Sequence, residues 1–158
     1  MESALLDELA TGDALERAES WRYSRNAVRA LAQQAFVAAD PRAALTPELR
    51  AQFDWPQTPS LRLVFVNGVF APAQSTFDAA GIAVTHDANG ACAVDVNADL
   101  ARPLHVVHAA VPGDAPSRWR ASLALRVARG ARATLIEQHI AAAGAEVLGV
   151  FDLDIDVA

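Results

Sequence analysis

The residues with the clearest chemical capacity are a carboxylate and an imidazole in the last third of the chain. Glu137 and His139 stand two positions apart in a segment that predicts a β-strand, so both side chains belong to one face of it. Such a pair can transfer protons or supply two ligands to a metal ion. Either role needs a third partner, and the spacing along the chain identifies none. We therefore interpret the pair as surface residues of a strand, with metal binding as the alternative.

Two further histidines, His105 and His108, form a His-x-x-His motif. On a helix this spacing would place both rings on one face, but the segment LHVVHAAV predicts a strand, where positions three apart face opposite sides. We therefore expect a structural role for each ring and no shared metal. An alternative function stays open, in which one of the two joins Glu137 and His139 in a small β-domain metal-dependent enzyme.

Other reactive residues lack the neighbours that catalysis needs. Cys92 lies in the apolar segment ACAV with no His or Lys nearby in the sequence, which indicates a buried thiol. Asp152, Asp154 and Asp156 are spaced like the start of a calcium loop. Val157 stands where that loop needs Gly, so the spacing indicates the solvated face of a strand. The sequence has no P-loop, dinucleotide fingerprint, Cys-x-x-Cys or Gly-x-Ser-x-Gly motif. We therefore expect that the chain is not an enzyme by itself.

The most unusual local cluster is Trp21-Arg22-Tyr23, which follows an acidic segment. Trp, Tyr and Arg are the residue types that dominate the hot spots of protein interfaces. Two interpretations stay open for this cluster: an aromatic anchor at a helix corner, or a contact with a partner protein. Trp21, Arg22 and Tyr23 are the candidate partner-contact residues of the chain.

Composition excludes several functional classes. The 158 residues suit one domain, or a small helical unit joined to one β unit, and the net charge is −6. All 13 basic residues are Arg, and they form no dense block, which argues against binding nucleic acid. One cysteine allows no intrachain disulfide and fits a reducing compartment. The first twenty residues contain no apolar run, and no stretch reaches the length of a membrane span. We expect a cytoplasmic protein.

The chain changes its hydrophobic period near residue 60. Residues 1–58 show helical spacing and helix caps, including Thr46-Pro47-Glu48, and Pro56 and Pro59 mark a linker. From Leu61 the period is two, and Asn67-Gly68 predicts a hairpin. Further strands are expected at 82–85, 92–96, 104–110, 121–128, 132–140 and 146–157. The predicted fold class is α+β: a helical region over 1–58, then a β-rich region over 61–158 that forms the first rungs of a right-handed parallel β-helix, with a sandwich or barrel as alternatives.

The last predicted strand alternates apolar residues with aspartates up to Ala158. A long alternating strand without a cap leaves an edge that can pair with another chain. We expect the chain to be a fragment or a shortened relative of a longer protein. A second copy that covers this strand, in a homodimer, is another possibility.

Three segments carry a resemblance to a known family. Residues 19–24 (ESWRYS), 63–70 (LVFVNGVF) and 130–137 (GARATLIE) resemble, in the same order, segments of the SufD family, which belongs to the SUF iron–sulfur cluster assembly system. The resemblance spans about residues 19–140. It implies an N-terminal helical region followed by the opening of a β-helix.

The resemblance also implies a function and partners. SufD-like proteins are scaffold components that act through contacts with a SufB-like paralogue and a SufC-like ATPase, and the larger complex handles the iron–sulfur cluster. The chain lacks the C-terminal helical domain and the late strands that carry the family's functional His, so no catalytic, cluster or cofactor residue is carried over. A free-standing interaction module is the remaining alternative.

Overall fold

The structure is a computed structural model that describes residues 30, 34–53, 55 and 58–158. Its contacts divide the chain into two compact units, Met1–Phe36 and Val37–Ala158. The elements of the second unit, in chain order, are β1 (Val37–Ala38), α4 (Pro47–Ala51), β2 (Leu61–Val66), β3 (Val69–Phe70), the 3-10 helix η2 (Pro72–Gln74), β4 (Ile82–His86), β5 (Cys92–Val96), β6 (Leu104–Ala110), β7 (Ser117–Val127), β8 (Leu135–Ala141) and β9 (Val147–Val157).

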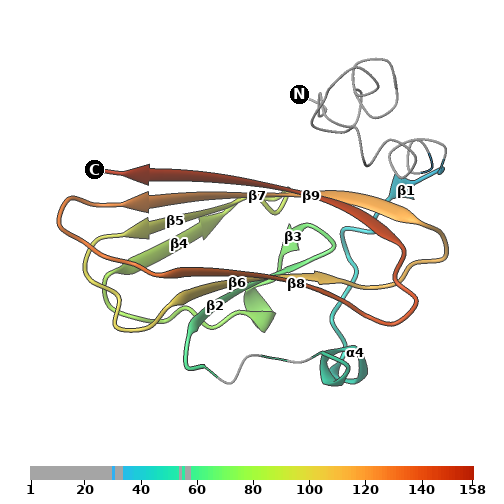
Figure 1. The fold of residues 1–158 in the computed structure, drawn as a ribbon, viewed down its shortest axis with the longest axis horizontal. Coiled ribbons are helices and arrows are strands. Elements are labelled where there is room, and N and C mark those ends of the chain that lie inside the picture. Colours follow the sequence, from blue (N-terminus) through green and yellow to red (C-terminus); the bar gives the residue numbers. More distant parts are fainter. Residues whose placement is uncertain (1–29, 31–33, 54, 56–57) are drawn as a thin grey trace, which may run out of the picture. The chain divides into compact units, whose positions relative to one another are not determined.

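The strands form two mixed sheets, which lie as two layers in Figure 1. One sheet has the order β1-β7-β5-β4, with β9 paired to β7 as well, and the other has the order β3-β2-β6-β8. From β6 onward successive strands alternate between the sheets. The last three strands each pair in parallel with the strand two before them: β7 with β5, β8 with β6 and β9 with β7.

The α+β prediction is wrong. The structure is 46% strand and 7% helical, and its described residues contain one α-helix, the five-residue α4. Val37–Ala38 lies inside the region 1–58 that was expected to be helical, yet it forms β1 and pairs in parallel with Ser117–Arg118. Ladder bonds to a distant strand outweigh local helical spacing, which is a weak determinant of structure. The helices expected before residue 30 and the Trp21–Tyr23 cluster lie outside the described residues.

The β-helix prediction is also wrong, because the two sheets are mixed. Tight turns reverse the chain twice, so β2 pairs antiparallel with β3, and β4 pairs antiparallel with β5. The first reversal is at Asn67-Gly68, where both residues have positive φ, 45° and 85°. A two-residue hairpin turn of this kind needs positive φ at both positions, which Asn and Gly tolerate. The hairpin predicted at Asn67-Gly68 is thus confirmed.

The helix start predicted at Thr46-Pro47-Glu48 is confirmed as well. Thr46 is the N-cap of α4, and its hydroxyl accepts a hydrogen bond from the Leu49 N–H at 3.3 Å. Pro47 occupies the first turn, where its missing N–H has no intrahelical partner to lose. Local signals were therefore sufficient for the short elements and insufficient for the fold class.

Apolar side chains fill both faces of the sheet that contains β2 and β6. Leu63 and Val106 lie between the two sheets, and Val64 and Val107 lie on the opposite face, under Leu45, Phe53 and the α4 segment. All seven residues of β6 are buried. Burial on both faces explains why these strands, LRLVFV and LHVVHAA, are mostly apolar and do not alternate regularly with polar residues.

The hairpin turn is tied to the connection between β6 and β7. The Asn67 side chain accepts a hydrogen bond from the Val111 N–H at 2.9 Å and donates one to the Val111 carbonyl at 3.4 Å. Asn67 is 6% exposed, so neither Val111 group has water as a ready substitute. The turn residue therefore serves the long-range packing in addition to its own backbone conformation.

We expect Asn67→Gly to lower the free energy of unfolding by about 1–3 kcal/mol, because glycine keeps the positive φ but leaves the buried Val111 groups unpaired. Urea unfolding measures this. The matched control is Asn89→Gly in the exposed turn before β5, which should change the free energy of unfolding by about 0.5 kcal/mol or less. Equal effects of the two substitutions would contradict a role for the Val111 bonds.

Candidate functional site

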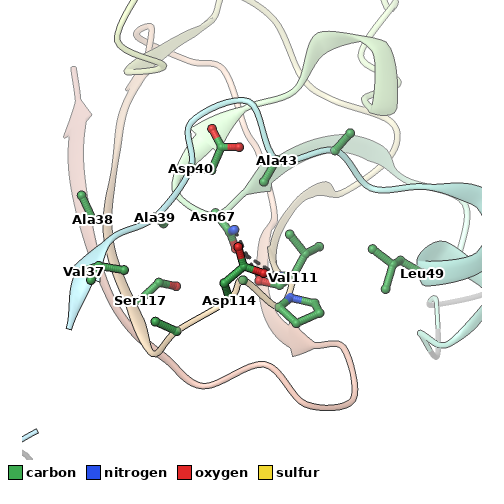
Figure 2. A pocket seen from close by; sticks show the side chains of 14 residues that line it. Val37, Ala38, Ala39, Asp40, Ala43, Leu49, Asn67, Val111, Asp114 and Ser117 are labelled. Atoms are coloured by element: carbon green, nitrogen blue, oxygen red, sulfur yellow. Dashed lines mark hydrogen bonds between the residues drawn. The ribbon is translucent and has the colours of Figure 1, made fainter. Parts of the chain in front are cut away.

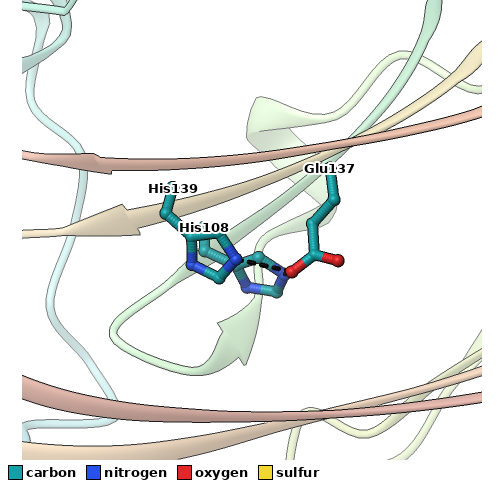
Figure 3. Close-up of side chains that lie close together, drawn as sticks. All are labelled: His108, Glu137 and His139. Atoms are coloured by element: carbon teal, nitrogen blue, oxygen red, sulfur yellow. Dashed lines mark hydrogen bonds and ion pairs between the residues drawn. The ribbon is translucent and has the colours of Figure 1, made fainter. Parts of the chain in front are cut away.

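Three titratable side chains gather at the edge strand β8. They are His108, Glu137 and His139, called here the His–Glu–His cluster (Figure 3). The parallel pairing of β6 with β8 sets His108 opposite His139 and Val106 opposite Glu137. Since alternate residues of a strand share a face, all three side chains lie on the face that packs toward the other sheet.

The distances within the cluster are short. His139 Nε2 lies 2.5 Å from Glu137 Oε1, and His108 Nε2 lies 4.0 Å from the same oxygen. The two imidazole rings are stacked, with centroids 4.7 Å apart and planes at 22°. One potential ligand atom from each residue falls within 4.8 Å of the others. The three residues therefore converge on a common point.

His108 is the buried member of the cluster. Its ring is enclosed by those of Phe65, Trp119 and Phe151, at centroid distances of 5.2, 6.0 and 4.0 Å. The residue is 1% exposed, and neither ring nitrogen has a hydrogen-bond partner among the described residues. An unpaired buried polar group costs about 1–3 kcal/mol. The unpaired ring nitrogens of His108 therefore need a structural or functional explanation.

Glu137 and His139 form the accessible side of the cluster. Their side chains are 33% and 58% exposed, so the cluster has one ring fixed in the core and two groups open to solvent. The indole of Trp119 packs directly over Gly149 of β9, where a Cβ would collide with its ring carbons. Gly149 thus makes room for one wall of the His108 site.

Burial, and secondarily the neighbouring His139, lowers the pKa of His108 to about 3. The ring is therefore neutral at physiological pH and keeps a lone pair on one nitrogen, which is the form that binds metal ions. Glu137 supplies a carboxylate oxygen, whose negative charge attracts a cation. The arrangement can bind a cation or pass a proton between Glu137 and His139.

The shifted pKa of His108 predicts an acid-sensitive fold. An unfolded imidazole titrates near pH 6.5, so between about pH 3 and pH 6.5 only the unfolded chain binds this proton. The free energy of unfolding is therefore unaffected by this group above pH 6.5 and decreases as the pH falls below it. We expect the free energy of unfolding, measured by urea titration with EDTA present, to drop by about 2 kcal/mol from pH 7 to pH 5 through His108 alone. His108→Phe keeps an aromatic ring at this position and should remove the contribution of His108 to the change of the free energy of unfolding with pH. An unchanged pH dependence in this variant would contradict the assignment to His108.

The sequence-based expectations for these residues had mixed outcomes. Glu137 and His139 share a face, as predicted, and bond to each other. His105 and His108 face opposite sides, also as predicted: burial and the nearby charge of Arg62 lower the pKa of His105, and Gln138 bonds to it. The third partner of the Glu137–His139 pair was named only as one of two candidates, His105 or His108, in the metal-enzyme alternative. It is His108, which register across two strands brings close and which no spacing along the chain reveals.

The aspartates of β9 occupy a solvated sheet face, as predicted, and arginines of the neighbouring strand β7 lie on the same face. Arg120 pairs with Asp152, and Arg126 pairs with Asp95 at 3.6 Å. Both pairs are exposed, so each adds little to stability. Opposite charges on neighbouring strands keep this face of the sheet polar and balance its acidic residues.

Cys92 is buried in the core, as predicted, with 4% of its surface exposed. Burial raises the pKa of its thiol to about 11. Because the thiolate is the reactive form, Cys92 should be inert in the folded protein. We expect its reaction with a thiol reagent at pH 8 to be at least about a hundred-fold slower than in the urea-unfolded chain. Comparable rates in the two states would show that the thiol is accessible.

A second feature is an open hollow of about 420 Å³ beside β1 (Figure 2). Its polar lining includes Asp40, Asn67 and Asp114. The Asp40 carboxylate accepts the N–H of Arg42 at 2.9 Å, and the Asn67 amide is engaged with Val111. These groups serve the protein's own backbone, so the His–Glu–His cluster is the stronger candidate site.

No protein-family model matches the chain, and no curated protein matches it significantly. Within the part of the chain that the structure describes, no helix has both the length and the apolar character required to cross a bilayer. Function is therefore argued from the residues and their arrangement.

Proposed function

We propose that the chain is a scaffold component of SUF-type iron–sulfur cluster assembly, which works in the cytoplasm through protein contacts and binds no iron–sulfur cluster of its own. The observation that carries the proposal is a pair of accessible strands, β8 and β9, which end the pairing in their respective sheets. The order of the three SufD-like segments supports the choice of system. Two of them, residues 63–70 and 130–137, supply the β2–β3 hairpin and the start of β8.

The two edges lie near each other. The ring centroids of His139 on β8 and Phe151 on β9 are 6.5 Å apart, so the edges belong to one side of the unit. Three of the four large apolar residues that are exposed in the described chain lie on these strands: Ile136, Ile155 and Val157. Exposed strand edges with apolar side chains are suited to pairing with strands of another protein.

The partners in this proposal are a SufB-like paralogue and a SufC-like ATPase. A scaffold role needs an exposed interface, and the eleven-residue strand β9 supplies one at the edge of its sheet. Its outer residues are 50% exposed at Ile155 and 68% at Val157. Covering these side chains on association would remove apolar surface from water, which favours binding.

The test is co-purification of the tagged chain with the SufB-like and SufC-like proteins of the same genome. We expect retention of at least one of them, and at least a ten-fold loss of affinity when Ile155 and Val157 are both replaced by Asp, because the charges must then be buried. Val37→Asp is the matched control, since Val37 is 53% exposed on β1.

The outcomes separate the alternatives. Failure to bind either partner would overturn the SUF assignment. Binding that the double substitution leaves unchanged would overturn the role of β9. Self-association that the double substitution abolishes, without partner binding, would favour a homodimeric interaction module.

A further inference from the structure

We propose that His108, Glu137 and His139 form a binding site for one divalent transition-metal ion of the Zn²⁺ or Fe²⁺ type. The proposal is independent of the scaffold function. It rests on three side chains that converge from the paired strands β6 and β8. Two of them are exposed, and the third, His108, is buried in the core.

The donor set favours this class of ion. Two imidazoles and one carboxylate suit zinc and iron(II), whereas calcium and magnesium prefer sites made of oxygen ligands. Three protein ligands leave at least one coordination position open. That position faces solvent, because Glu137 and His139 form the exposed side of the cluster.

The geometry is close to what an ion needs. Bonds of about 2.0–2.2 Å in a tetrahedral site hold ligand atoms roughly 3.3–3.6 Å apart. The Glu137 oxygen lies 2.5 Å from His139 Nε2 and 4.0 Å from His108 Nε2, on either side of that value. Rotation of the two exposed side chains can equalise these distances.

His108 supplies the observation that points specifically to a ligand. Its ring nitrogens are buried and have no hydrogen-bond partner among the described residues, and one of them is directed at Glu137. A surface pair such as Glu137–His139 needs no ion to account for it. An ion would, however, explain the buried imidazole of His108 beside that pair, because coordination would use the ring nitrogen that the fold leaves unpaired.

The apolar walls make the site rigid. Phe65 and Trp119 stack on the His108 ring, and Phe151 packs against it with its ring plane tilted by 55°. The Trp119 indole lies over Gly149. A ligand held by packing loses little freedom when it binds, and an apolar shell around a metal limits the access of water. His108 is therefore a preorganised ligand, and the exposed side chains of Glu137 and His139 can adjust to complete the site.

The experiment uses the full chain, freed of metal with EDTA. Calorimetric titration with Zn²⁺ and visible spectroscopy with Co²⁺ measure stoichiometry and coordination. We expect one ion per chain and a Co²⁺ spectrum of four- or five-coordinate nitrogen and oxygen ligation. His139→Ala and Glu137→Gln, both at accessible positions, should each weaken binding at least ten-fold. His108→Phe, which keeps the ring stack, should weaken it by a similar factor or more.

His86→Ala is the matched control, since His86 is an exposed histidine of β4 outside the cluster. It should leave the affinity unchanged. The proposal fails if the wild-type chain binds no stoichiometric ion. It also fails if His108→Phe, shown to be folded by circular dichroism, binds as tightly as the wild type. A loss of binding in His86→Ala equal to that in His139→Ala would identify adventitious surface binding and would overturn the proposal as well.

Discussion

The parallel pairing of β6 with β2 on one side and with β8 on the other is the interaction on which the remaining structure depends. Every residue of β6 is buried, so each of its backbone polar groups must find its partner in a neighbouring strand. The apolar faces on both sides of the strand leave one register: a slip by one residue would exchange the two faces, and with them His105 and His108. The core between the sheets, the covering by the α4 segment and the alignment of His108 with His139 all depend on this register.

A neutral imidazole in the core has lost the hydrogen bonds that its ring nitrogens would make in water. Phe65 and Trp119 stack on the His108 ring, Phe151 contacts it at a tilt, and Gly149 makes room for the Trp119 indole. Aromatic contacts of this kind contribute about 0.5–1.5 kcal/mol each beyond apolar burial. They do not replace the hydrogen bonds that the ring nitrogens would make in water. The same apolar enclosure lowers the pKa of His108, so the features that destabilise the residue also keep it in the form that can bind a metal.

The proposed interface and the proposed metal site occupy the same side of the β unit. Glu137 and His139 belong to the edge strand β8, and Phe151 connects the cluster to β9. A partner strand that paired with β8 would cover the open side of the cluster and reduce its contact with water. Metal affinity and partner affinity would then depend on each other, since ligands that change each other's surroundings are coupled reciprocally.

The local features could be predicted from the sequence, because their causes lie within a few residues. The Asn67-Gly68 turn, the Thr46 cap, the strands β4–β9 and the shared face of Glu137 and His139 follow from local backbone and hydrophobic preferences. The fold class and the composition of the site depend on contacts between distant segments. Val37–Ala38 became a strand because β7 offers it ladder bonds, and the chain formed two mixed sheets because its turns reverse it twice. His108 joined Glu137 and His139 because strand register brings together residues that are 29 to 31 positions apart. This register depends on how the apolar faces of two strands distant in the sequence pack together, which the spacing within either strand does not show.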